Sequence, residues 1–167
     1  YMKKKMVNML IAAAVSICMA AAPVSAATWV KDGKGWWYIA AQGKVLEQVG
    51  SPGSVMSVTG LTAQDPVPGE LVAVEEEQAS RLEYVLDLLM ALDAREMLAD
   101  CSALDCSRPG VLLLDYRDFR LKLPSTGEFD YMLGFLEGIF KEGRVDRDGS
   151  GTFDFTIEEG KAVYSQD

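Results

Sequence analysis

Hydrophobic and polar residues follow their most regular pattern over residues 111–140. In the segment FRLKL, which starts at Phe119, apolar and basic residues alternate, as expected for a strand with one buried and one exposed face. The segment that begins at Phe129 instead repeats its apolar residues at the spacing of one helix face. This stripe consists of Phe129, Met132, Leu133, Leu136, Ile139 and Phe140. We expect the helix to cover the dry face of the sheet that contains the strand.

A second helix is predicted over Ala79 to Leu98, again from the spacing of its apolar residues. Its stripe consists of Leu82, Val85, Leu86, Leu89 and Leu92, with Leu88 and Met90 widening it. An acidic run, Glu75-Glu76-Glu77, lies at the start of this helix, where the positive end of the helix dipole favours acidic side chains. We therefore interpret these glutamates as a solvated first turn.

The remaining segments are shorter and contain more turn residues. Glycine and proline break residues 50–70 into loop, with a short strand predicted at Val55 to Val58. A terminal hairpin is predicted at the end of the chain, with Lys161 to Tyr164 as its last strand. Together these elements predict an α+β fold. It contains a mixed β-sheet with two amphipathic helices packed on one side, and a short aromatic β-hairpin at the N-terminus.

The first 26 residues have the pattern of a Sec-type signal peptide. Three lysines precede an apolar run from Met6 to Ala22, and the helix-breaking Pro23 and the small residues after it predict cleavage after Ala26. An uncleaved membrane anchor is the alternative, although the run is short for a span of about 20 residues. The lysines orient the N-terminus toward the cytoplasm, so the rest of the chain is expected outside it, either secreted or associated with the cell envelope.

Aromatic residues dominate the start of the mature chain. Residues 28–49 resemble one repeat of the choline-binding, cell-wall-binding type, with the pattern W-x-x-x-G-x-x-W-W-Y followed by a turn with glycine. In that family each repeat is a β-hairpin, and the ligand occupies an aromatic cage between consecutive repeats. The resemblance implies a cage that attracts a quaternary ammonium through cation–π contacts. Its candidate residues are Trp29, Trp36, Trp37 and Tyr38. Because only one repeat is present, the alternative is an aromatic hairpin that packs at the edge of the main domain.

Composition argues against several classes of function. The formal net charge of −9 disfavours nucleic acid and anionic membrane surfaces as partners. The chain has no histidine, which removes the commonest general base and imidazole metal ligands. Asp115, Asp118 and Asp130 are candidate catalytic carboxylates, but each falls at a predicted turn or helix start that already accounts for it. We expect a protein that is not an enzyme and needs no cofactor.

Two further patterns leave alternatives open. Cys101 and Cys106 could form a disulfide in an oxidising compartment, or they could be two buried free thiols. An Asp/Gly-rich segment near the C-terminus partly matches an EF-hand calcium loop, but Ile157 occupies the position that requires a bidentate Glu. We interpret the segment as a turn that leads into the terminal hairpin, with weak calcium binding as the alternative. The calcium candidates are Asp146, Asp148, Ser150 and Asp154.

The order of elements from about residue 38 to residue 167 resembles the β-domain of the FtsQ/DivIB cell-division proteins. The segments that carry this resemblance are, in order, IAAQGKVLEQ, SVTGLT with a turn at Thr59-Gly60, LLMALDAREML, LLLDYRDFRLKL, FDYMLGFLEGIF and GTFDFTIEEGKAVY. Pro124 and Met132 stand where members of that family usually have Gly and Lys. Together, the N-terminal pattern and the two resemblances predict three parts: a signal peptide or uncleaved anchor (1–26), an aromatic hairpin (27–49) and an FtsQ/DivIB-like β-domain (50–167). In the alternative division, residues 36–49 are the first hairpin of the β-domain.

The same resemblance implies a non-enzymatic scaffold of the bacterial divisome. In that family the C-terminal edge of the β-domain binds a small FtsB/DivIC-type partner by adding a strand. The matching residues here are Lys161, Ala162, Val163 and Tyr164. A secreted cell-wall-associated protein that uses its aromatic hairpin to bind choline or a wall polymer is the alternative. Contact with a membrane is expected only if the N-terminal segment is uncleaved.

Overall fold

The structure, a computed structural model, describes residues 27–51 and 53–166. Within these residues ten strands form one mixed sheet, which confirms the predicted α+β class. The strands are β1 (Ala27–Lys31), β2 (Trp36–Ala40), β3 (Val45–Val49), β4 (Ser57–Gln64), β5 (Ala73–Val74), β6 (Cys101–Asp105), β7 (Val111–Tyr116), β8 (Phe119–Pro124), β9 (Gly151–Asp154) and β10 (Val163–Ser165). The helices are η1 (Glu76–Gln78), α1 (Ala79–Ala94), η2 (Leu98–Asp100) and α2 (Phe129–Lys141).

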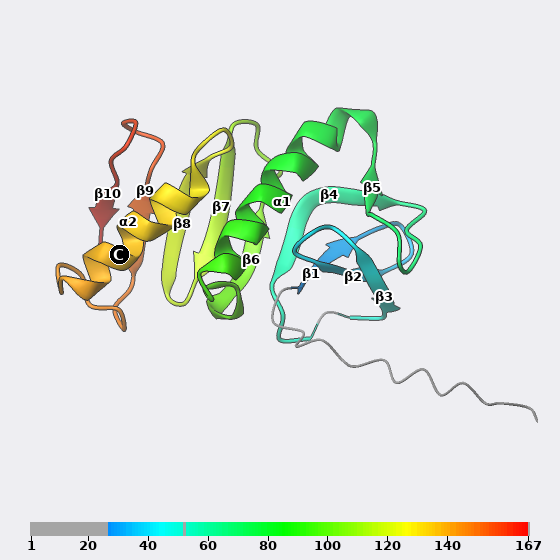
Figure 1. The fold of residues 1–167 in the computed structure, drawn as a ribbon, viewed down its shortest axis with the longest axis horizontal. Coiled ribbons are helices and arrows are strands. Elements are labelled where there is room, and N and C mark those ends of the chain that lie inside the picture. The colour runs from blue at the N-terminus through cyan, green and yellow to red at the C-terminus, as the bar shows by residue number, and fades with distance from the viewer. Residues whose placement is uncertain (1–26, 52, 167) are drawn as a thin grey trace, which may run out of the picture.

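The strands do not follow one another in chain order. The sheet runs β10-β9-β8-β7-β6-β4-β1-β2-β3, and the short β5 pairs with β4. Parallel pairs join β1 to β4, β4 to β6 and β8 to β9, while the other neighbours are antiparallel. Both long helices lie across the same face of the sheet (Figure 1). The aromatic hairpin over residues 27–49 therefore belongs to the same sheet as the rest of the described chain.

Helix α2 covers the strands nearest the C-terminus, as the apolar pattern predicted. The three apolar residues of the FRLKL segment in β8 are buried, and the basic residues between them are on the other face. The Phe140 ring of α2 lies 5.2 Å from the Phe119 ring and 5.9 Å from the Phe153 ring, measured between centroids. These aromatic contacts hold the helix against β8 and β9.

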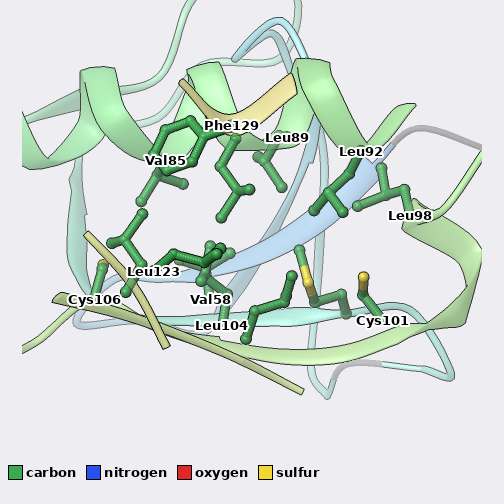
Figure 2. Close-up of a cluster of buried hydrophobic side chains, with 14 of the residues drawn as sticks. Val58, Val85, Leu89, Leu92, Leu98, Cys101, Leu104, Cys106, Leu123 and Phe129 are labelled. Atoms are coloured by element: carbon green, nitrogen blue, oxygen red, sulfur yellow. The ribbon is translucent and has the colours of Figure 1, made fainter. Parts of the chain in front are cut away.

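Helix α1 covers the middle of the sheet but ends earlier than predicted. It stops at Ala94 rather than at Leu98, because Glu96 adopts a left-handed backbone conformation (φ 56°) that ends the helix. Figure 2 shows its apolar side chains directed toward those of β4 and β6, such as Val58 and Leu104. Met90, predicted to widen the stripe, is exposed. The helix residues that are buried are Val85, Leu88, Leu89 and Leu92.

Strand β4 corrects the interpretation of Thr59-Gly60 as a turn. The strand extends over eight residues, and the pair lies inside it. Val30 of β1 pairs with Val58, but the next residue of β1 pairs with Thr62. The residues of β4 between Val58 and Thr62 therefore form a bulge. Gly60 has φ 93°, and a Cβ atom there would lie 2.4 Å from the backbone nitrogen of Ser107. Glycine therefore allows a bulge with close backbone approach rather than a chain reversal.

Candidate interaction site

The C-terminal end of the sheet has an open strand edge. Strand β10 pairs with β9 on one side and is last in the strand order, so its outer backbone groups face away from the sheet. The ring of Tyr164 packs against Phe153 (centroids 4.9 Å apart), and its hydroxyl donates a hydrogen bond to the carbonyl of Ser150 (2.9 Å). Val163 is 47% exposed. The edge is thus held in place from one side and open on the other.

The predicted partner-binding residues lie at this edge, but the strand begins later than predicted. Val163 and Tyr164 belong to β10, whereas Lys161 and Ala162 precede it. Lys161 belongs to a turn in which its backbone N–H and its ammonium both bind Glu158, at 3.2 and 2.6 Å. Ala162 packs against the core. The local turn explains the difference, because its hydrogen bonds compete with strand pairing.

The opposite end of the sheet is partly closed. The N–H of Val45 in β3 donates to the carbonyl of Glu70 (2.8 Å), and the carbonyl of Val45 accepts from the N–H of Gly69 (2.8 Å). An antiparallel bridge between Lys44 and Leu71 extends this contact. A loop therefore occupies the start of the β3 edge, whereas within the described residues β10 pairs only with β9.

A cleft of about 600 Å³ lies beside the start of β10. It is formed by the turn before α2, the first turn of α2 and the connection between β9 and β10. Met132 and Phe155 are buried in its lining, while Tyr131 is 54% exposed. Sequence reasoning did not find this site, because its walls come from segments about 30 positions apart. The available signal was Tyr131, a large aromatic residue outside the apolar stripe of its helix.

The predicted aromatic cage does not form from the predicted set. Trp37 faces the main core, where its indole N–H donates to the carboxylate of Asp32 (2.8 Å). Trp36 and Tyr38 belong to a separate apolar cluster, because consecutive strand residues point to opposite faces of the sheet. The ammonium of Lys31 already lies 5.7 Å from the centroid of the Trp36 ring. The remaining cage candidate, Trp29, lies in β1, where it is the backbone pairing partner of Tyr38 in β2.

The Asp32 carboxylate organises the turn between β1 and β2. Partial burial would raise its pKa, but hydrogen bonds from the Trp37 indole and from the backbone N–H groups of Lys34 and Gly35 outweigh that effect and lower the pKa. The charged form is therefore stabilised by the chain's own donors. This arrangement supports the interpretation of the hairpin as a structural part of the sheet.

Within the described residues Cys101 and Cys106 are free and buried, which contradicts the disulfide candidate and confirms the alternative of two buried free thiols. Cys101 begins β6 and Cys106 follows its end, so the strand separates their Cα atoms by roughly 16 Å, far beyond disulfide reach. They lie on opposite sides of the cluster in Figure 2. Burial raises the pKa of Cys101 to about 12 and that of Cys106 to about 11. Both thiols are thus neutral side chains of the core.

The calcium candidates are also dispersed. The Asp146 carboxylate accepts a hydrogen bond from the backbone N–H of Asp148, which closes a local turn. Asp154 lies in β9, where it pairs with Lys122 (3.4 Å), and the Ser150 carbonyl accepts the Tyr164 hydroxyl. Among residues 27–51 and 53–166, no group of three or more His, Cys, Asp or Glu side chains could hold a metal ion. Asp146 and Asp154 are thus engaged in contacts within the chain, one in a turn and one between strands.

Two of the three candidate catalytic carboxylates form ion pairs with arginines, and the third lies in a turn. Asp115 forms a two-point contact with the Arg120 guanidinium (2.8 and 3.1 Å), and Asp130 pairs with Arg95 (2.9 Å). Asp118 lies in the turn between β7 and β8. Asp115, Asp118 and Arg120 help to line a shallow cleft of about 480 Å³ on the sheet face opposite the helices. The Asp115–Arg120 pair joins the neighbouring strands β7 and β8 on that face.

Comparison with known proteins adds no further assignment: no family model, curated protein or solved structure matches the chain. The predicted signal peptide over residues 1–26 lies outside the described residues. Among the helices that the structure describes, none has the length and apolar character needed to cross a membrane. Function must therefore be inferred from the geometry of the sheet edge and of the cleft beside it.

Proposed function

We propose that this protein is a non-enzymatic extracytoplasmic interaction domain of the bacterial cell-division type, which binds a protein partner by strand addition at β10. The observation that supports the proposal is the unequal state of the two sheet ends. The edge of β3 is partly occupied by residues 69–70, whereas β10 offers its outer backbone groups to a partner. The FtsQ/DivIB resemblance adds the partner class, a small protein of the FtsB/DivIC type.

The surroundings of β10 suit this mode of binding. Tyr164 holds the strand against β9 through its ring and its hydroxyl, so little ordering of the edge is needed when a partner arrives. Added backbone hydrogen bonds supply affinity, and side chains next to the edge supply specificity. Val163, Ile157 and Tyr131 are exposed apolar side chains at this end of the sheet. They offer apolar area that a partner strand and its flanks can cover.

Proline substitution tests the proposal. Val163→Pro removes a backbone donor and the extended pairing geometry of β10, so recovery of the FtsB/DivIC-type protein of the host should be lost in co-purification from envelope extracts. Val67→Pro is the matched control, because Val67 is also about half exposed but lies in a loop already flanked by two prolines. Recovery that is equal for Val163→Pro and Val67→Pro would contradict strand addition at β10.

A further inference from the structure

The cleft lies beside the residues that precede β10. Gly160 and Lys161, which lead directly into β10, form one wall, and the first turn of α2 forms the other. Because Lys161 lies only two residues before β10, a strand added to β10 would have one flank beside this wall of the cleft. Met132 and Phe155 give the cleft an apolar lining, and the exposed ring of Tyr131 borders it.

The charges around the cleft are not balanced. Two of its lining residues, Glu128 and Glu159, are exposed, and within the described residues neither carboxylate has a hydrogen-bonding or ion-pair partner. The single lysine of the lining, Lys161, already pairs with Glu158 at 2.6 Å. The cleft thus combines an apolar interior with two unpaired negative charges. In a chain with a net charge of −9, the neighbouring surface does little to offset them.

This combination fits one class of side chain. Lysine and arginine have long apolar stems and cationic ends, so the stem can lie against an apolar wall while the cation stays near water and carboxylates. Arginine can also lie over an aromatic ring such as that of Tyr131. A purely apolar side chain would leave both carboxylates without a counter-charge, and an acidic one would be repelled.

We propose that the cleft receives a lysine or arginine of the partner, at a position that flanks the strand added to β10. This inference rests on the proposed function, because the added strand brings the basic residue to the cleft. It assigns a specificity determinant to Glu128 and Glu159 and defines the partner as an extended segment with a basic flank. The backbone of β10 then supplies general affinity, and the cleft selects among strands.

Fluorescent peptides provide the test. Each peptide carries the same alternating Thr-Val segment, with arginine, glutamine or glutamate at one flank, and a second set carries the same residues at the other flank. Binding to the chain beginning at Ala27 is measured by fluorescence anisotropy. We expect one arginine-flanked peptide to bind about fivefold more tightly than its glutamine analogue, as for a partly exposed ion pair. Glu128→Gln/Glu159→Gln should remove that difference while the chain keeps its cooperative thermal unfolding; a small fall in the thermal midpoint is expected, because Glu128 is the N-cap residue of α2.

A matched control and two distinct failures complete the design. Glu76→Gln/Glu77→Gln makes the same charge change in exposed residues of η1, and it should preserve the preference for arginine. Equal binding of the arginine and glutamine peptides overturns the basic-flank inference but leaves strand addition intact. A preference for arginine that survives Val163→Pro overturns strand addition instead. Binding of none of the peptides overturns both. If the chain forms dimers and Val163→Pro abolishes them, the strand added to β10 comes from a second copy of this chain, and the inference is overturned.

Discussion

At Gly60 the fold depends on the absence of a side chain. Gly60 has a left-handed backbone conformation (φ 93°), which strains any other residue. A Cβ atom there would also lie 2.4 Å from the Ser107 nitrogen, so a side chain is excluded on both grounds. Gly60→Ala should therefore lower the free energy of unfolding by roughly 2–4 kcal/mol, measured by urea denaturation. Gly138→Ala is the control, because it lies inside α2 with open space at its Cβ position and should stabilise by about 0.5–1 kcal/mol. Similar effects of the two substitutions would contradict this account.

Gly60 also marks a limit of sequence reasoning at the residue scale. A Thr-Gly pair between apolar residues is compatible with a turn or with a bulge. The choice depends on β1, which pairs on both sides of the bulge, and on residues 106–107, which approach it closely. These contacts come from distant parts of the chain, so no local pattern contains them. Buried alternating positions such as those of β8 were predictable because a single local period decides them.

Between elements, Arg95 joins the two helices. From the end of α1 its guanidinium binds two carboxylates of α2, Asp130 at 2.9 Å and Glu137 at 2.6 Å. Arg95→Gln should lower the free energy of unfolding by about 1 kcal/mol, since the side chain is partly buried and both contacts are lost. Arg144→Gln, which breaks an exposed pair with Glu142, should change it by less than about 0.5 kcal/mol. Urea denaturation of both variants checks the difference, and equal values would show that the inter-helix contact contributes little.

The helices illustrate what was predictable at this scale. The stripe of α2 located both its limits and its buried face, because its burial follows one period over three turns. The end of α1 was not predictable, since the left-handed Glu96 terminates it without a glycine or proline signal. The cleft beside β10 was not predicted from the sequence for a similar reason. Its walls meet only after α2 has packed and the chain has returned to form β10.

For the whole molecule, the buried thiols predict a loss of stability in alkali. Burial raises the pKa of Cys101 to about 12 and of Cys106 to about 11, against about 8.5 for an unfolded thiol. The folded state therefore keeps protons that the unfolded state releases, so the stabilisation is complete below pH 8.5 and is lost as pH rises toward the folded values. Each thiol should contribute a slope of about 1.4 kcal/mol per pH unit within that window.

Urea denaturation between pH 8 and 10.5 under reducing conditions measures this slope. The Cys101→Ala/Cys106→Ala variant should show a shallower decline than the unmodified chain, whatever its stability at neutral pH. Tyrosine ionisation affects both proteins alike and therefore cancels in the comparison. The same slope in both would show that the thiols do not control the alkaline transition.

The strand order was the least predictable property of the whole molecule. Local patterns located β8 and the two hairpins, but the strand predicted at Val55 to Val58 overlaps β4 only at Ser57 and Val58. In addition, β1 lies between β2 and β4 rather than at an end of the sheet. The aromatic hairpin over residues 27–49 therefore shares the main core through Trp37, Ile39 and Val45. An appended repeat and an integral part of the sheet have the same alternating sequence, and only the parallel pairing of β1 with β4 distinguishes them.

The interior position of β1 also determines when its two edges can be paired during synthesis. A chain that leaves the ribosome N-terminus first presents β1, β2 and β3 before the parallel neighbour β4 exists. Helix α1, whose Leu86 packs against Gly43 next to β3, emerges later still. During that interval Trp37 and Ile39 have no cover, and the three-stranded ribbon displays an apolar face and an unpaired β1 edge. We therefore expect the N-terminal part of this chain to expose apolar surface until the segment up to about residue 94 is available to cover it.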